Sequence, residues 1–216
     1  IVFPNKRAGL FFNEYLAKQS QQPIWAPTYL SINELFRSLS SKEIGDTIKL
    51  VCKLYKAYCA ETQNSESLDD FYFWGELMLS DFDDADKNMV ETDLLFSNMK
   101  DLRALMNDLS FMDEEQEAAI QQFFLHFSIE KRTALKERFI SMWDVLGNIY
   151  KRFKQELSTE NIAYEGMLYR EVIETLNTDT LPYDTYVFVG FNVLNKVEHT
   201  LFSKLQQVGK AIFYWD

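Results

Sequence analysis

The residues best suited to binding an anion lie near the beginning of the sequence, at Asn5, Lys6 and Arg7. They follow the apolar run 1–3, which has the β-branched and aromatic character of a buried strand. A strand that leads into a helix N-terminus offers free backbone N–H groups and a favourable dipole, and the two cations would add charge for a phosphate. The alternative, which the spacing alone favours, is a solvated first turn with two ordinary basic residues.

A second polar position, Asn192, ends the continuous apolar run 186–191. Such a run predicts a strand buried on both faces, and ligands of parallel sheets bind outside the carboxyl ends of the strands. An active P-loop NTPase holds an aspartate at this place to position Mg²⁺, and the Asn192 amide cannot supply that negative charge. The alternative is a polar strand end that caps the next helix. The chain contains no G-x-x-x-x-G-K-[ST] motif, so an active ATPase would need a phosphate loop before Ile1.

The other charged clusters have simpler interpretations. The acidic stretch 81–86 lacks calcium-loop spacing, so we expect a solvated turn. His126 and His199 have no catalytic partner at a recognisable spacing, and we interpret both as structural or surface residues. A basic set alternates with acids, which favours a salt-bridged solvent face over a nucleic-acid path. This set comprises Lys131, Arg132, Lys136, Arg138, Lys151, Arg152 and Lys154. No catalytic residue, metal ligand or cofactor of its own is predicted for this chain.

The composition is that of a packed chain with an acidic surface. It has 216 residues, 47% of them hydrophobic, and a formal net charge of −11, so strong DNA binding by this chain alone is not expected. Cys52 and Cys59 are spaced i, i+7, roughly 10 Å along a helix, which is too far for a disulfide. We therefore expect core cysteines in a reducing, cytoplasmic compartment. No apolar run reaches about 18 residues, so no membrane span is predicted.

Short elements near the beginning must position the candidate residues. Residues 1–4 are predicted to form a buried strand and residues 6–18 a helix. The inward-facing residues of this helix are expected to be Leu10, Phe11, Tyr15 and Leu16. Two prolines make 24–30 an extended or edge segment, and the capping-box pattern of 31–34 starts a short helix that ends at about residue 39.

From about residue 44 to 176 the pattern is helical, and no convincing strand is found. The expected helices cover about 44–59, 67–79, 93–106, a segment that starts at 113, 131–157 and 164–176. The first of these is expected to bury Ile44, Ile48, Val51, Cys52, Tyr55, Tyr58 and Cys59 on one face.

After residue 176 the pattern becomes strand, helix and strand, at 186–191, 193–207 and 211–215, with Gly209 as the helix C-cap. This βαβ unit implies a parallel sheet. We therefore predict an α/β fold, mostly helical overall, with a sheet part at 1–40 and 177–216 and a helical insertion at 41–176. Because the chain begins and stops on apolar strand-like runs, we expect it to be part of a larger protein.

Several segments together resemble the N-terminal region of AddB-like helicase–nuclease proteins, relatives of UvrD and RecB, in the version found in Bacteroidetes. They are Phe3-Pro4-Asn5-Lys6-Arg7-Ala8-Gly9-Leu10-Phe11, the stretch 71–83 with FYFWGE and SDFDD, Ala163-Tyr164-Glu165-Gly166-Met167 and Val189-Gly190-Phe191-Asn192-Val193-Leu194-Asn195. The resemblance implies a parallel P-loop-NTPase-like (RecA-like) sheet with the helical insertion. It also implies a degenerate helicase part that scans DNA, and an Mg²⁺-dependent PD-(D/E)XK nuclease domain outside this chain.

By this resemblance, residues 3–7 would align with a motif beside the single-stranded DNA path, and Asn192 would stand where active relatives keep a carboxylate. ATP hydrolysis by this domain is therefore not expected. The implied partners are single-stranded DNA and a helicase subunit. Two other hypotheses remain open, an acidic interaction module that docks a partner subunit and an active ATPase with its phosphate loop upstream.

Overall fold

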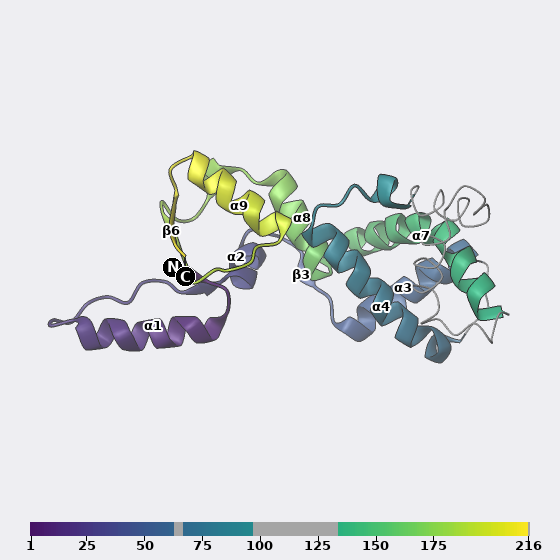
Figure 1. The fold of residues 1–216 in the computed structure, drawn as a ribbon, viewed down its shortest axis with the longest axis horizontal. Coiled ribbons are helices and arrows are strands. Elements are labelled where there is room, and N and C mark those ends of the chain that lie inside the picture. The colour runs from purple at the N-terminus through teal and green to yellow at the C-terminus, as the bar shows by residue number, and fades with distance from the viewer. Residues whose placement is uncertain (63–66, 97–133, 216) are drawn as a thin grey trace, which may run out of the picture.

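The computed structural model describes residues 1–62, 67–96 and 134–215, and the side chains of all of these except 134–144 (Figure 1). The predicted helices at 93–106 and from 113 fall largely outside the described residues, as do His126, Lys131 and Arg132. Within the described ranges, no helix combines the length and apolar character that crossing a membrane requires.

One parallel sheet joins the two ends of the chain. It consists of β1 (Val2–Phe3), β2 (Leu30–Ser31), β5 (Tyr186–Val189) and β6 (Ala211–Tyr214), in the order β2-β1-β5-β6. Val2 pairs with Leu30 on one side and with Phe188 on the other. A single mostly helical α/β fold, with strands from both ends bracketing a helical block, is therefore confirmed.

The N-terminal helices begin where the sequence predicts. Helix α1 (Lys6–Gln19) is capped by Asn5, and α2 (Ile32–Ser38) has the capping box formed by Ser31 and Glu34. The predicted inward face of α1 is wrong, because Leu10, Phe11 and Tyr15 are exposed.

The contact of α1 with the sheet uses the opposite side of the helix. Gly9 is buried there, and its nearest neighbours across the contact are Phe3 and Tyr29. The Phe12 ring completes this contact, at 5.6 Å from the Phe3 ring and 6.0 Å from the Tyr29 ring.

The helical block is built on α3 (Thr47–Thr62), α4 (Leu68–Lys87) and α7 (Ala134–Thr159). Both α4 and α7 pack on α3, so the buried part of α3 is rotated from the predicted face. Its buried residues are Leu50, Val51, Leu54, Ala57 and Tyr58. Ile48 is exposed, and the two cysteines are half-buried rather than in the core.

The prediction that 44–176 contains no strand is wrong. Strand β3 (Glu43–Ile44) pairs in parallel with β4 (Ile162–Ala163) in a second, two-stranded sheet. Two-residue strands leave no periodic pattern in the sequence, which is why they were missed. Their backbone hydrogen bonds, such as Gly45 N–H to the Ala163 carbonyl at 2.9 Å, join the entry of the helical block to its exit.

Helix α8 (Glu165–Thr175) connects the block to the sheet part. It contacts α4 on one side and α2 and α9 (Lys196–Gln207) on the other. The rings of Phe36 in α2 and Tyr169 in α8 stack at 4.0 Å. The Lys204 ammonium of α9 donates to the Ile173 carbonyl at 2.7 Å. Apolar and polar contacts therefore both fix the block against the sheet part.

The predicted βαβ unit is confirmed as β5, α9 and β6, with Gly209 in the left-handed region after α9. The predicted burial of 186–191 on both faces is wrong, because Val187 and Val189 of β5 are only half-buried. Helix α9 covers one face, where Phe202 contacts Phe188 at 4.1 Å, and α1 lies on the other side of the sheet (Figure 1). Helix α1 packs on β1 and β2, and Ile212 and Tyr214 of β6 are exposed.

Candidate functional site

The sequence-predicted residues meet at one edge of the sheet. Asn5 follows β1, and Asn192 follows β5, its parallel neighbour. Because parallel strands end at the same side, both residues lie at the carboxyl edge, where ligands of such sheets bind. The chain leaves β5 through Gly190, which has a φ of 74°, a conformation that favours glycine.

Asn5 is used mainly to start α1. Its Oδ1 accepts a hydrogen bond from the Ala8 backbone N–H at 3.1 Å, which satisfies one of the free donors of the first turn. The carbonyl oxygen is thus occupied, and only its Nδ2 group is left to contact a phosphate. We assign Asn5 a positioning role for the two cations that follow it.

Lys6 is paired within the edge. Its Nζ lies 2.6 Å from Oε1 of Glu34, whose second oxygen accepts from the backbone N–H and the hydroxyl of Ser31, both at 2.9 Å. The Lys6 hydrogen bond and the Ser31 backbone N–H lower the pKa of Glu34 to about 2. Glu34 is therefore ionised at neutral pH and offsets part of the Lys6 charge.

Arg7 and Asn192 are the most available polar groups of the edge. Both side chains are exposed, and neither makes an ion pair or side-chain hydrogen bond with a residue that the structure describes. Arg7 can therefore offer its full guanidinium fork to a phosphate. Asn192 offers an amide, which can hydrogen-bond a nucleotide but adds no charge.

The sequence missed a buried charge cluster in the helical block. The stretch 81–86, expected to be a solvated turn, continues α4, and Asp86 is 0% exposed. Its carboxylate accepts from the hydroxyls of Tyr150 at 2.6 Å and Tyr164 at 2.5 Å. The Lys154 ammonium lies 3.1 Å from both carboxylate oxygens. One signal was present, because Asp86 follows the buried Phe82 by four residues on the apolar face of α4.

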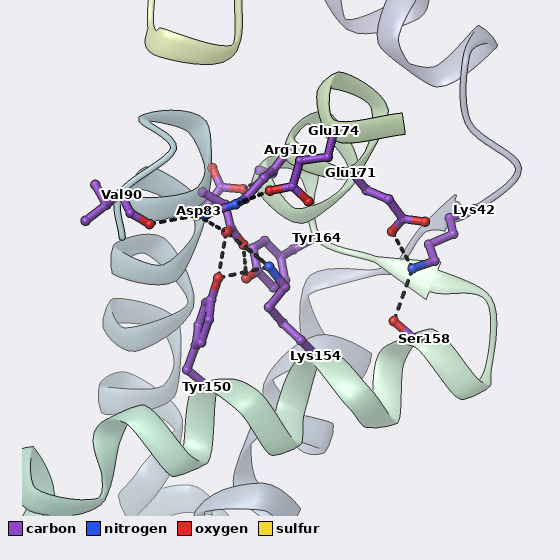
Figure 2. Close-up of polar contacts among 12 residues, drawn as sticks. Lys42, Asp83, Val90, Tyr150, Lys154, Ser158, Tyr164, Arg170, Glu171 and Glu174 are labelled. Carbon is purple, nitrogen blue, oxygen red and sulfur yellow. Dashed lines mark hydrogen bonds and ion pairs between the residues drawn. The ribbon is translucent and has the colours of Figure 1, made fainter. Parts of the chain in front are cut away.

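A fourth donor completes the Asp86 cluster. Nη1 of Arg170, in α8, lies 3.3 Å from Asp86 Oδ1 and 2.8 Å from the Val90 carbonyl (Figure 2). Burial raises the pKa values of Tyr150 and Tyr164, and the hydrogen bonds to Asp86 act in the same direction, so both remain protonated donors. With four donors around it, the carboxylate has no open position for a substrate, so we assign it a structural role.

A cavity of about 360 Å³ lies beside this cluster, between α7 and α8. Its charged lining groups already have partners. Lys154 and Arg170 face Asp86, Arg170 also pairs with Glu174, and Glu171 accepts from Lys42 at 2.5 Å. This cavity therefore offers no free charge to a ligand. Among the described residues, no group of three His, Cys, Asp or Glu side chains is placed to hold a metal ion.

The remaining basic residues behave as a salt-bridged face where they are described. Lys151 pairs with Asp93 at 2.6 Å, and Arg152 pairs with Glu61 at 2.5 Å. Lys154 differs because it turns inward to Asp86, and burial lowers its pKa despite the attraction of that carboxylate. The side chains of Lys136 and Arg138 fall outside the described residues. His199 lies exposed on α9.

No protein-family model, curated protein or solved structure matches this chain.

Proposed function

We propose that this chain is the helicase-like, non-catalytic region of an AddB-like DNA repair nuclease, and that it scans single-stranded DNA as a scaffold. The observation that carries this proposal is the placement of Lys6, Arg7 and Asn192 at the carboxyl edge of a parallel sheet. The interruption of that sheet by a helical block agrees with a RecA-like core at 1–40 and 177–216. The cutting would be done by an Mg²⁺-dependent nuclease domain outside this chain.

In this proposal the sheet part does not hydrolyse ATP. The position after β5 carries an amide, Asn192, and an amide cannot supply the negative charge that holds Mg²⁺ on a nucleotide. Movement along DNA would then require a motor on a helicase partner subunit.

A second candidate function is a docking module for such a partner subunit. It is favoured by Phe73 and Leu77, which are exposed one helical turn apart on α4, within an acidic block. Under this alternative the gene product copurifies with a stoichiometric partner and does not bind single-stranded DNA.

Removing the edge cations should weaken DNA binding. For the full-length gene product carrying K6A and R7A, we expect roughly tenfold weaker binding to a fluorescein-labelled oligothymidylate at low salt. The slope of log affinity against log salt should fall by about 1.4, because each of the two lost phosphate contacts on a single strand contributes about 0.7. Fluorescence anisotropy across a salt titration measures both quantities.

Two matched variants control this experiment. K151A/R152A removes two exposed cations from α7, in the helical block, and should change affinity less than K6A/R7A. E34Q releases Lys6 from its ion pair while keeping a capping acceptor, so it should tighten binding. If K6A/R7A and K151A/R152A bind equally well, the carboxyl edge of the sheet is not the DNA site.

The nuclease assignment has its own test. We expect the full-length gene product to degrade linear DNA with Mg²⁺ and to stop when EDTA removes the metal, while its binding to oligothymidylate persists in EDTA. The purified protein should not consume ATP, and ATP should accelerate degradation only when a partner motor is added. Absence of cutting by the folded protein with Mg²⁺ would sink the nuclease proposal and favour the docking module.

A further inference from the structure

The first thirty residues differ in charge from the rest of the chain. They contain Lys6, Arg7 and Lys18 and a single acid, Glu14, which gives 3 − 1 = +2. The remaining 186 residues therefore carry −11 − 2 = −13, with histidine counted as neutral. A polyanion is thus attracted to this segment and repelled by most of the remaining surface.

The side of α1 that faces away from the sheet is apolar and aromatic. Leu10 is 74% exposed, Phe11 58% and Tyr15 67%. Arg7, Phe11 and Tyr15 follow one another at intervals of four residues, so they form one line over roughly 12 Å of helix. The opposite side of α1 holds the sheet contact, which explains why this line is uncovered (Figure 1).

A cation also lies beside these rings. The Lys18 ammonium lies 5.8 Å from the centre of the Tyr15 ring and 2.6 Å from Glu14, and it is well exposed. After α1 the chain runs extended between two prolines, where Trp25 is 99% exposed. The Tyr29 hydroxyl donates to Asn13 at 3.1 Å and ties the returning segment to α1. Trp25 is therefore held on an anchored segment next to the helix.

Exposed aromatic rings alternating with cations suit one class of partner. Rings stack on nucleobases whatever their sequence, and cations track the phosphate backbone. A purely apolar protein groove would instead require burying the Arg7 charge without a partner. The charge of +2 on the first thirty residues further favours a polyanion over an apolar protein groove as the partner.

We propose that the outward face of α1 is a stacking surface for the bases of single-stranded nucleic acid. Arg7 connects this stacking surface to the carboxyl edge of the sheet. Phe11 and Tyr15 stack on bases, and Trp25 extends the surface beyond the end of α1. The inference rests on the proposed function, since it lengthens the DNA path that begins at Lys6. Binding on this face is independent of sequence, because every base has an aromatic face.

The test separates stacking from charge. The full-length gene product and its F11A/Y15A variant are titrated into labelled oligothymidylate and into an abasic oligonucleotide with the same number of phosphates. We expect the unmodified protein to prefer the oligothymidylate, and the variant to lose about tenfold or more of that affinity. Binding to the abasic chain should not change. F73A, which removes an exposed ring on α4, serves as the matched control and should bind as the unmodified protein does.

Each other outcome overturns a specific claim. If F11A/Y15A binds oligothymidylate normally while K6A/R7A does not, the stacking surface is wrong and the strand-end site stands. If the unmodified protein binds neither oligonucleotide, the proposed function fails and this inference fails with it. If F11A/Y15A instead loses a copurifying protein and keeps its DNA affinity, the face docks a protein.

Discussion

Replacing Asp86 with asparagine should lower the free energy of unfolding by about 3–5 kcal/mol, the largest effect that we expect from one side chain. Asp86 is fully buried, and the Lys154 and Arg170 side chains that surround it are largely buried too. Asparagine keeps the shape and removes the charge. Lys154 then remains in a poorly hydrated position without an anion, and Arg170 keeps only its ion pair with Glu174. In addition, one amide N–H of the new asparagine faces donors rather than acceptors.

Urea denaturation followed by circular dichroism measures this loss, and D84N is the matched control. Asp84 belongs to the same helix but is exposed, so D84N should change stability by less than about 0.5 kcal/mol. Adding K154M to D86N should recover part of the loss, because it removes one uncompensated cation.

The D86N variant also tests the structural role of the cluster. Under conditions in which D86N is folded, it should bind oligothymidylate with the same affinity as the unmodified protein. The reason is that Asp86 lies in the helical block and not at the carboxyl edge of the sheet. A loss below about 1 kcal/mol for D86N would contradict the structural role assigned to the Asp86 carboxylate.

The G166A substitution should destabilise the protein by about 1–3 kcal/mol, although alanine ordinarily favours a helix over glycine. A Cβ atom at Gly166 would lie 2.3 Å from the Asp83 carbonyl oxygen and 3.1 Å from the Asp83 Cα. These are backbone atoms of α4, which cannot rotate away as a side chain can. The same crossing carries the Gly166 N–H hydrogen bond to the Asp83 carboxylate at 2.6 Å.

G9A is the control for G166A, and its expected effect on stability has the opposite sign. Gly9 also lies in a helix, but its nearest neighbour for an added Cβ is 3.5 Å away, an ordinary contact. G9A should therefore stabilise the protein by roughly 0.5–1 kcal/mol. Thermal unfolding of G166A and G9A measures both effects on stability. Equal melting temperatures for the two variants would show that α4 and α8 do not approach as closely as described.

These two sites have a common consequence for the fold. Asp83 and Asp86 both lie at the end of α4, and each is held by α8, the helix that also packs against α2 and α9. Lys87 reinforces this junction through ion pairs with Asp83 and Glu165, both at 2.8 Å. The C-terminal end of α4 is therefore joined by polar contacts to α8, the helix that connects the helical block to the sheet part.

Local signals were enough to determine the helix starts and the parallel βαβ unit. The Ser31 cap acts on Glu34, three residues further along, so both partners are visible in the sequence. An apolar run such as 186–191 predicts a strand without knowledge of its neighbours. The positions of Asn5, Lys6, Arg7 and Asn192 at strand ends followed from these elements alone.

Only the tertiary structure decided which faces are covered. The burial of Asp86 depends on donors from α7 and α8, more than sixty residues away in the sequence. The aromatic face of α1 is uncovered because the opposite side of the helix, which includes Gly9, packs against the sheet part. The pairing of β3 with β4 joins segments separated by the whole helical block. The spacing of apolar residues shows whether a segment forms a helix or a strand, but it does not show which distant segment packs against it. These features could therefore be known only from the folded chain.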